Sequence, residues 1–227
     1  SSAASDVYKR QGGAVYRNAD PSDIVVTAAG GLVGETVQIW KPKQRNTFET
    51  EWGFSCMGYE ISGALGIKMA KPDQDVIVFV GDGSYLLNNS DIYSSIIYEK
   101  KLIIVVCDNS GHMVINRLQL AKGGKEYLCN LKSARATNFV EIDFAAHAAS
   151  MGAETETVSS TSELESAFKR AKQSKKTYVI AIKTHGYEWL KGTSIWESPT
   201  LEVHTSEENK TAYKDHIEGK KKQRQGV

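Results

Sequence analysis

The sequence predicts an α/β fold, in which an open and mostly parallel sheet carries helices on both faces. Three continuous apolar runs, at residues 76–80, 102–107 and 178–182, have the length and composition of buried strands. Two of them stop at clusters of turn residues, and segments with helical spacing separate the runs. Alternation of buried strands with helices is typical of parallel sheets built from crossover units.

The first expected strand is a β-branched apolar run at residues 24–28, which breaks at the glycine turn Gly30-Gly31. A helix is expected over residues 59–70. Small residues gather in this region, namely Gly58, Ser62, Gly63, Ala64 and Gly66. A helix with so small a face can approach another backbone or a ligand closely.

The centre of the expected sheet is a strand–helix–strand unit. The strand at 76–80 ends in the tight turn Gly81-Asp82-Gly83, a helix follows over residues 91–100, and the strand at 102–107 ends in Asp108-Asn109-Ser110-Gly111. A right-handed crossover makes these strands parallel neighbours, so both turns lie at the carboxyl edge of the sheet. Ligands of open α/β sheets bind at that edge.

The rest of the sheet follows from the second half of the chain. A helix is expected over residues 142–151 and a strand over 153–158. The capping box Ser162-Glu163-Leu164-Glu165 is expected to open the next helix, which leads to the last strand at 178–182. One face of that helix is apolar, with Leu164, Ala167, Phe168 and Ala171.

The chain divides into a single domain with an extension at each end. Residues 1–13 are small, polar and without periodicity, which predicts a disordered or foreign extension. Residues 14–184 form the domain. Residues 185–227 form a C-terminal extension with Trp189, Trp196 and Pro199, a helix over 209–222, and a basic tail that we interpret as solvated.

Composition excludes several classes of protein. The 227 residues are 41% hydrophobic and 24% charged, with a net charge of +1, which favours neither nucleic acid nor an anionic membrane as partner. No apolar run reaches the roughly 18 residues of a membrane span. Cys56, Cys107 and Cys129 lack metal-binding spacing and are expected to be reduced core thiols, so we expect a soluble cytoplasmic protein.

The candidate ligand-binding residues lie in the two turns at the carboxyl edge of the expected sheet. Twenty-five residues lie between Gly83 and Asn109, so one carboxylate, from Asp82, and one amide face the same crevice. Mg²⁺ takes about six oxygen ligands at roughly 2.0–2.1 Å, and one backbone carbonyl in the Asn109-Ser110-Gly111 turn can supply a third from the protein. A diphosphate would provide two more ligands and bind the backbone N–H groups of Gly83 and Ser84, where a helix begins.

These motifs resemble those of thiamine diphosphate enzymes, specifically the C-terminal cofactor-binding (PP) domain of the acetolactate synthase-like group. The resemblance covers about residues 20–183 and includes the turn Phe54-Ser55-Cys56-Met57-Gly58. The group's usual Asn-Asn pair is Asp108-Asn109 here, which departs from the pattern in its first residue and keeps the ligating Asn109.

Within that group, the chain is most similar to the ring-opening trihydroxycyclohexanedione hydrolases of myo-inositol catabolism. The segments that carry this similarity are residues 51–60, 81–86, 89–90, 108–111, 115–119 and 201–206. The resemblance implies a small polyol-derived dione as substrate. It also places Leu118 and Gln119 in a loop over the thiazolium ring of the cofactor.

The resemblance further implies which residues bind thiamine diphosphate and Mg²⁺. Asp82, Asn109 and the backbone of Gly111 become metal ligands. Gly81, Gly83 and Ser84 hold the diphosphate, the backbone of Gly30, Gly31 and Leu32 forms the opposite loop, and Met57 bends the cofactor. Packing within the helix is the alternative role for Met57.

The catalytic glutamate of the family lies in an N-terminal domain outside these residues. Glu49, Glu51 and Glu60 are not in that domain's motif, and we interpret Glu51 and Glu60 as structural or adjacent to substrate. The chain is therefore expected to need the missing N-terminal domains, to be inactive without them, and to work as a homo-oligomer.

Two other functions remain open at this point. The same cofactor could serve a 2-oxo acid lyase or transferase like acetolactate synthase, or the domain could bind the cofactor without turnover. A Rossmann dehydrogenase and a P-loop enzyme are disfavoured because neither glycine-rich fingerprint is present.

Overall fold

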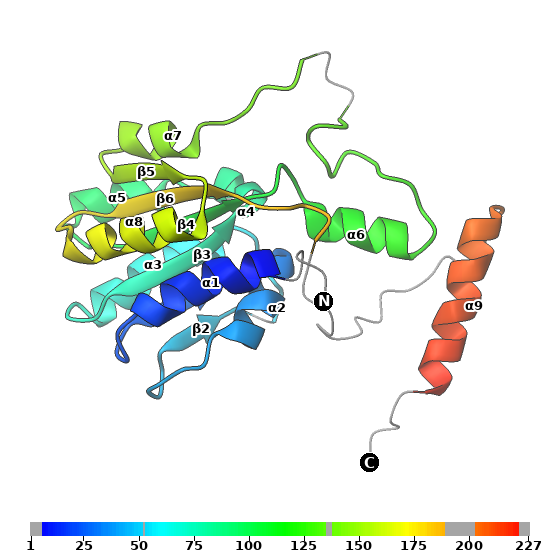
Figure 1. Cartoon of the computed structure of the whole chain (residues 1–227), viewed down its shortest axis with the longest axis horizontal. Coiled ribbons are helices and arrows are strands. Elements are labelled where there is room, and N and C mark those ends of the chain that lie inside the picture. The colour runs from blue at the N-terminus through cyan, green and yellow to red at the C-terminus, as the bar shows by residue number, and fades with distance from the viewer. Residues whose placement is uncertain (1–5, 52, 135–137, 189–202, 223–227) are drawn as a thin grey trace.

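Six parallel strands form one sheet in the order β2-β1-β3-β4-β6-β5 (Figure 1). The structure is a computed structural model that describes residues 6–51, 53–134, 138–188 and 203–222, and all counts refer to these residues. The strands are β1 (Ile24–Thr27), β2 (Phe48–Thr50), β3 (Val76–Gly81), β4 (Ile103–Asp108), β5 (Glu154–Val158) and β6 (Tyr178–Lys183). The prediction of an open parallel sheet is confirmed.

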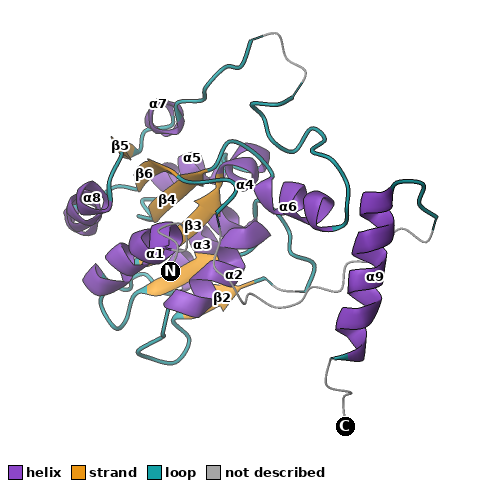
Figure 2. Cartoon of the chain, turned by 45° about the vertical axis from the view of Figure 1, so that its right-hand side comes forward, coloured by secondary structure: helices purple, strands orange, loops and turns teal. Residues whose placement is uncertain are grey.

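Helices cover both faces of this sheet (Figure 2). The helices are α1 (Asp6–Asn18), α2 (Gly30–Ile39), α3 (Tyr59–Ala70), α4 (Asp82–Leu87), α5 (Asp91–Ile97), α6 (Met113–Ala121), α7 (Phe144–Ser150), α8 (Thr161–Gln173) and α9 (Glu207–Lys221). Helices α1, α2 and α8 pack on one face, and α3, α4, α5 and α7 pack on the other.

Alternate side chains along each strand point to opposite faces of the sheet and pack into two separate hydrophobic cores. In β3, Ile77 and Phe79 point to the core that contains α1 and α8, whereas Val78 and Val80 point to the core that contains α3 and α7. Both sets are at most 2% exposed. Burial on both faces explains why these strands read as unbroken apolar runs in the sequence.

The topology opens a crevice between β1 and β3. The chain leaves β1 for β2 at the sheet edge and then returns through α3 to the other side of β1, where β3 pairs with it. Adjacent connections therefore leave the carboxyl ends of β1 and β3 in opposite directions, which is where open α/β sheets bind ligands.

Helices α6 and α9 lie outside the two helical layers (Figure 1). Helix α6 lies beyond the carboxyl edge of the sheet and contacts α2. Helix α9 stands away from the sheet and has no buried residues, but the amide of Asn209 at its start donates to the carbonyl of Lys122 at 2.9 Å. Among the described helices, none combines the length and apolar character that crossing a membrane requires.

The N-terminal region differs from the expectation of disorder over residues 1–13. Residues from Asp6 onward form α1, and Ala14 and Val15 of this helix are fully buried against the sheet. Its two glycines hide the helical periodicity in the sequence. Residues 1–5 lie outside the described residues.

Several boundaries also differ. The expected turn at Gly30-Gly31 is the start of α2, and the tight turn after β3 is a direct passage from Gly81 into α4. The capping box lies two residues earlier than predicted: Ser160 accepts from Glu163 N at 3.2 Å, and Glu163 accepts from Ser159 N at 2.8 Å.

The helices expected over 91–100 and 142–151 are shorter, and the one expected over 209–222 begins at Glu207, after the capping residue Ser206. Trp189, Trp196, Pro199 and the end of the basic tail lie outside the described residues. Cys56 is exposed, in contrast to the expected core thiol, because it lies in the loop before α3.

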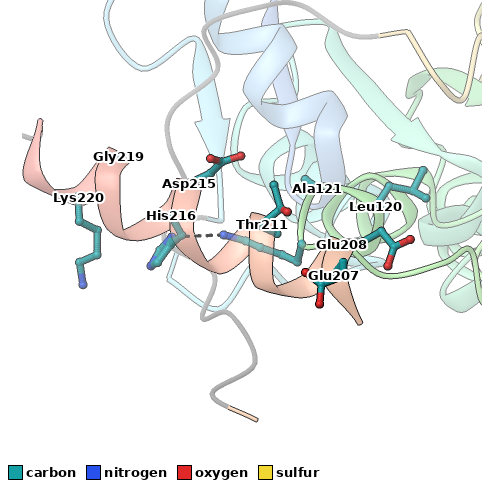
Figure 3. Close-up of a pocket in the computed structure, with 12 residues that line it drawn as sticks. Leu120, Ala121, Glu207, Glu208, Thr211, Asp215, His216, Gly219 and Lys220 are labelled. Carbon is teal, nitrogen blue, oxygen red and sulfur yellow. Dashed lines mark hydrogen bonds between the residues drawn. The ribbon is translucent and has the colours of Figure 1, made fainter. Parts of the chain in front are cut away.

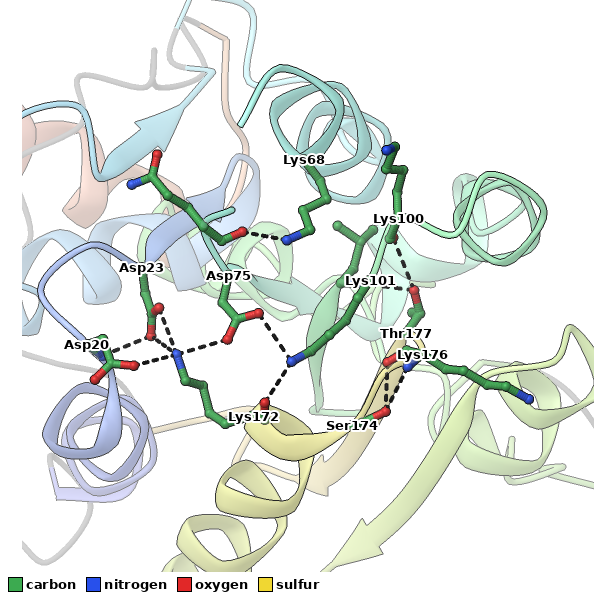
Figure 4. A network of polar contacts seen from close by, with 12 residues as sticks. Asp20, Asp23, Lys68, Asp75, Lys100, Lys101, Lys172, Ser174, Lys176 and Thr177 are labelled. Atoms are coloured by element: carbon green, nitrogen blue, oxygen red, sulfur yellow. Dashed lines mark hydrogen bonds and ion pairs between the residues drawn. The ribbon is translucent and has the colours of Figure 1, made fainter. Parts of the chain in front are cut away.

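A network of lysines and aspartates joins the amino ends of the strands (Figure 4). Lys172, near the end of α8, contacts Asp20 at 2.9 Å, both carboxylate oxygens of Asp23 at 2.8 Å, and Asp75 at 2.9 Å. Burial opposes its charge, but hydrogen bonds to Asp20, Asp23 and Asp75 prevail and raise the pKa of Lys172. The network lies at the edge of the sheet opposite to the crevice.

Replacing Lys172 by Met is expected to destabilise the fold by about 3 kcal/mol, because Asp23 would remain buried at 3% exposure without its cation. Lys169→Met, on the exposed face of the same helix, is the control and should change the free energy of unfolding by less than about 0.5 kcal/mol. Urea unfolding of both variants measures this, and equal midpoints would contradict it.

Candidate functional site

One cavity of about 330 Å³ opens at the carboxyl edge of the sheet, at the crevice between β1 and β3. All nine residues that the sequence places in a cofactor site line it, namely Gly30, Gly31, Met57, Gly81, Asp82, Gly83, Ser84, Asn109 and Gly111. They come from the start of α2, the loop before α3, the passage from β3 into α4, and the loop after β4. The topology therefore brings together four segments that are distant in sequence.

Asp82 is the buried carboxylate of this cavity. It is 2% exposed, and its Oδ2 accepts the backbone N–H of Gly111 at 2.6 Å. Burial, together with the nearby charge of Asp108, raises the pKa of Asp82 to about 7. The folded chain thus disfavours the negative charge of this group unless a cation accompanies it.

Asn109 completes a set of three convergent groups. One terminal atom of its carboxamide lies 3.3 Å from Asp82 Oδ1 and 2.8 Å from the carbonyl oxygen of Gly111. With nitrogen in this position the amide donates to both oxygens, which is the orientation that satisfies the hydrogen bonds of the ligand-free chain. A bound cation would favour the opposite orientation, with the amide oxygen beside the other two oxygens. Neighbouring oxygens of an octahedral site with metal–oxygen bonds of roughly 2.0–2.1 Å are about 3.0 Å apart.

The donor set therefore fits Mg²⁺ with one carboxylate, one amide and one carbonyl. No group of three or more His, Cys, Asp or Glu residues suited to a metal occurs in the described part of the chain. A site of this composition leaves positions for water or phosphate, as Mg²⁺ sites do, and lacks the nitrogen and sulfur ligands that zinc prefers.

Asp108, the departure from the usual Asn-Asn pair, has structural contacts. Its Oδ1 accepts the backbone N–H of Ser110 at 2.9 Å, and its Oδ2 pairs with Lys183, which also pairs with Glu141. These contacts shape the loop that presents Asn109 and Gly111. Asp108 lies at the end of β4, and it does not line the cavity.

Two glycines leave space that a larger residue would fill. A Cβ atom on Gly83 would lie 2.7 Å from the ring of His112 and 3.4 Å from Met57 Cε. A Cβ atom on Gly111 would lie 2.1 Å from the carbonyl oxygen of Cys129, and Gly111 has a φ of +147°. Position 111 therefore requires glycine, whereas a side chain at position 83 would require the ring of His112 to move.

Gly111→Ala is expected to destabilise the chain by about 2 kcal/mol or more, since the new methyl group would collide with backbone at a positive φ. Gly66→Ala is the matched control, because a Cβ atom on Gly66, within α3, would have no neighbouring atom within 4 Å. It should stabilise the chain by up to about 1 kcal/mol. Thermal melting measures both, and shifts of the same sign would contradict the requirement for glycine at position 111.

The segment before α3 forms one lip of the cavity. Glu51 accepts the backbone N–H groups of Phe54 and Cys56, each at 2.8 Å, and the bond from Cys56 is the main reason why the pKa of Glu51 is lowered. Met57 is 39% exposed and Phe54 is 89% exposed at this lip. Glu51 thus orders the loop; neither it nor Glu49 lines the cavity.

Glu60 is buried behind the same lip at 1% exposure. Burial raises the pKa of its carboxyl group, which accepts the N–H groups of Ala29 at 3.2 Å and Gly58 at 2.9 Å. It does not line the cavity either. None of the three glutamates therefore presents a free carboxylate to a ligand in this cavity.

Helix α6 forms one wall of the cavity, and the sequence-based prediction for this wall was wrong. Leu118 and Gln119 lie in this helix instead of a loop, and they do not line the cavity. Met113, Val114, Ile115 and Arg117 line it instead, together with His112, Glu35, and His185 to Gly186 after β6. The position of residues 185–186 after a parallel strand is a signal that could have predicted their place at this edge.

A second, larger hollow of about 680 Å³ lies between the end of α6 and α9 (Figure 3). Lys122 Nζ lies 3.4 Å from His216 Nδ1 across it. Its other lining residues are mainly exposed side chains of α9, such as Glu207 and Asp215. None of the residues that the sequence places in a cofactor site lies here.

The chain is similar to known proteins over most of its length. Residues 28–182 match the family model described as thiamine pyrophosphate enzyme, C-terminal TPP binding domain; thiamine pyrophosphate is another name for thiamine diphosphate. The 3D-(3,5/4)-trihydroxycyclohexane-1,2-dione hydrolase of Halalkalibacterium halodurans is 38% identical over 200 residues, which cover 86% of this chain and 31% of that protein. A Bacillus cereus protein named 3D-(3,5/4)-trihydroxycyclohexane-1,2-dione hydrolase 2 is 38% identical over 217 residues, covering 90% and 33%.

Solved structures show the same fold. A thiamine diphosphate-dependent 4-hydroxybenzoylformate decarboxylase of Rhodococcus jostii superposes with a TM-score of 0.70 at 18% identity, covering 82% of this chain and 34% of that one. The benzoylformate decarboxylase of Polynucleobacter necessarius gives 0.64 at 19% identity, covering 79% and 33%. The chain thus spans about a third of the length of the curated relatives and solved proteins that it matches.

Proposed function

Because this chain belongs to the thiamine pyrophosphate enzymes as a C-terminal TPP-binding domain, we propose that its cavity binds thiamine diphosphate through Mg²⁺. We further propose that the longer protein opens the ring of 3D-(3,5/4)-trihydroxycyclohexane-1,2-dione by hydrolysis. Curated relatives that carry this name, at 36% to 38% identity, support the proposal. The decarboxylase structures support the fold alone.

The convergence of the Asp82 carboxylate, the Asn109 amide and the Gly111 carbonyl in the cavity is the observation that carries the proposal. Asp82, Asn109 and the carbonyl of Gly111 would hold Mg²⁺, whose remaining ligands come from water and the diphosphate. The backbone of Gly83 and Ser84, beside this set, would bind the diphosphate.

The other walls would receive the rest of the cofactor. Gly30, Gly31 and Leu32 offer backbone groups on the opposite side of the cavity, with Gly81 at its floor. Met57 faces Gly83 closely enough to support a bent cofactor, since its Cε lies 3.4 Å from a Cβ position there. Val114 and Ile115 give this cavity an apolar lining.

Thiamine diphosphate supplies, when bound, an electron sink for cleaving a carbon–carbon bond beside a carbonyl group. The residues of this chain bind and orient it. We propose that the glutamate that moves the activating proton lies in the part of the longer protein that this chain does not cover, because Glu51 and Glu60 are occupied by backbone amides.

Assembly and location are part of the same proposal. Phe54, Met57 and Ile115 expose 89%, 39% and 44% of their surface at the mouth of the cavity, which is an apolar rim that the N-terminal domains or a second subunit would cover. The apolar rim favours a homo-oligomer. The three free thiols favour the reducing environment of the cytoplasm.

Product analysis with the longer protein tests the substrate. With thiamine diphosphate and Mg²⁺ present, we expect consumption of the cyclic dione to an open-chain acid and no condensation or decarboxylation of pyruvate. Turnover of pyruvate with an inert dione would establish the 2-oxo acid alternative. Cofactor binding without turnover of either compound would establish a binding module.

A further inference from the structure

Glu60 connects three segments of the cavity wall from behind. Its Oε1 accepts the N–H of Ala29, at the start of α2, at 3.2 Å. Its Oε2 accepts the N–H of Gly58, next to Met57, at 2.9 Å. The hydroxyl of Ser84, in the first turn of α4, also hydrogen-bonds to it. We call these three contacts the Glu60 bridge.

The residues that Glu60 holds stand beside the expected cofactor contacts. Ala29 precedes Gly30, Gly58 follows Met57, and Ser84 follows Gly83. Ala29 and Ser84 also line the cavity themselves. A buried group behind the wall therefore sets the spacing of three segments that would touch one ligand.

The helices at this cavity begin without capping side chains. The residues that precede α2, α3 and α4 are Ala29, Gly58 and Gly81, and none makes a side-chain hydrogen bond to its helix. Helices α7, α8 and α9 begin elsewhere with Asp143, Ser160 and Ser206, each of which accepts a backbone N–H. Helix α5 also lacks such a bond, but its start does not line the cavity.

Missing caps leave N–H groups at the helix starts available to a ligand, but they also remove the contacts that normally fix a helix end. The Glu60 bridge replaces that fixation. It bonds to the N–H groups of Ala29 and Gly58, which precede the two helices, and to the N–H of Glu60 itself, so the N–H groups in the first turn of α2 are not consumed.

We infer that Glu60 is a positioning residue, which fixes the starts of α2, α3 and α4 at the spacing that binds the diphosphate cofactor. This inference rests on the proposed function and adds a residue that does not touch the ligand. A purely local role as a cap of α3 would need only the bond to Gly58. The bond to Ala29, 31 residues away, and the bond to Ser84 require the wider role.

Glu60→Gln tests the inference, because the amide keeps one acceptor oxygen and replaces the other with a donor. Glu163→Gln is the matched control: Glu163 accepts the N–H of Ser159 at 2.8 Å at the start of α8, far from the cavity lining. Thermal melting of each chain with and without millimolar thiamine diphosphate and Mg²⁺ separates basal stability from stabilisation by the ligand.

We expect the control to retain the ligand-induced rise in Tm, and Glu60→Gln to bind about 10-fold more weakly, which removes up to about 1.4 kcal/mol of ligand stabilisation and lowers the rise accordingly. Glu60→Asp, which keeps the charge but shortens the reach, should also show a smaller rise and serves if the first variant fails to fold. A folded variant of either kind with the wild-type rise would overturn the inference. A wild-type chain without any rise would overturn the proposed function as well.

Discussion

Asp82→Asn is expected to weaken Mg²⁺-dependent binding of thiamine diphosphate by at least about 100-fold. The substitution keeps the size of the side chain and removes the only charge of the three-oxygen set formed with Asn109 and Gly111. Neither the amide of Asn109 nor a carbonyl replaces a carboxylate for a hard divalent cation. Isothermal titration of the variant with the cofactor at saturating Mg²⁺ measures the loss.

The same substitution is expected to raise the Tm of the ligand-free chain by about 3 °C or more. Burial raises the pKa of Asp82 from 3.8 to about 7, so the fold disfavours its carboxylate form. Between about pH 4 and pH 7, Asp82 retains a proton in the native state that it has lost in the unfolded chain. The wild type therefore loses stability relative to the variant as pH rises from about 4 to about 7, and the difference is constant above that range.

Asp143→Asn is the control for both measurements, because Asp143 caps α7 through Ala146 N, and Asn caps a helix equally well. It should change neither binding nor Tm. Unchanged cofactor affinity in Asp82→Asn would exclude the proposed metal site. Lower stability of the ligand-free variant at pH 8 would show that burial does not oppose the charge of Asp82.

Ring opening of the dione is expected to be at least about 10³-fold slower with this chain alone than with the longer protein. General acid–base catalysis contributes on the order of 10² to 10⁴ to such reactions, and the resemblance implies that the activating glutamate lies in the N-terminal domains. Two glutamates of the described residues line the cavity, Glu35 in α2 and Glu188 after β6, and we expect neither to replace it. The assay compares both proteins at high cofactor and Mg²⁺.

Comparable turnover by both proteins would place the base within this chain. Glu35→Gln, Glu188→Gln, Glu51→Gln and Glu60→Gln would then be compared in the isolated chain, and the variant that alone loses turnover would identify it. We expect instead that activity returns only with the N-terminal domains, and that the apolar rim at Phe54, Met57 and Ile115 makes the isolated chain self-associate.

The central sheet, and the position of Asp82 and Asn109 at one edge of it, could be predicted from sequence because buried strands leave a clear local pattern. Strands buried on both faces are unbroken apolar runs, as in β3 and β4, and parallel strands place Asp82 and Asn109 at one edge. The convergence of Asp82, Asn109 and Gly111 then follows from topology. Only their exact distances needed the structure.

Helices whose stability comes from tertiary contacts could not be predicted in the same way. Helix α1 contains Gly12 and Gly13, which weaken any local helical signal, and packing of Ala14 and Val15 on the sheet determines it. Helix α2 begins with two glycines and without a capping side chain, so it resembles a turn in sequence.

The role of Glu60 also needed the structure. A carboxylate between Tyr59 and Ile61 in an apolar helix gives no indication of its partner, because Ala29 is 31 residues away and donates through its backbone. The wall formed by α6 was missed for a related reason. The helix turns Val114 and Ile115 toward the cavity, whereas Leu118 and Gln119 do not line it.

Titration of the chain with thiamine diphosphate, in the presence of Mg²⁺ and again in excess chelator, is the decisive test of the proposed metal-dependent site. We expect measurable binding with Mg²⁺ and none with chelator, since the Asp82 carboxylate and the Gly111 carbonyl would repel the diphosphate unless a cation bridges them. Equal affinity in both conditions would refute the site, because the cofactor would then bind without the metal that these residues are proposed to hold.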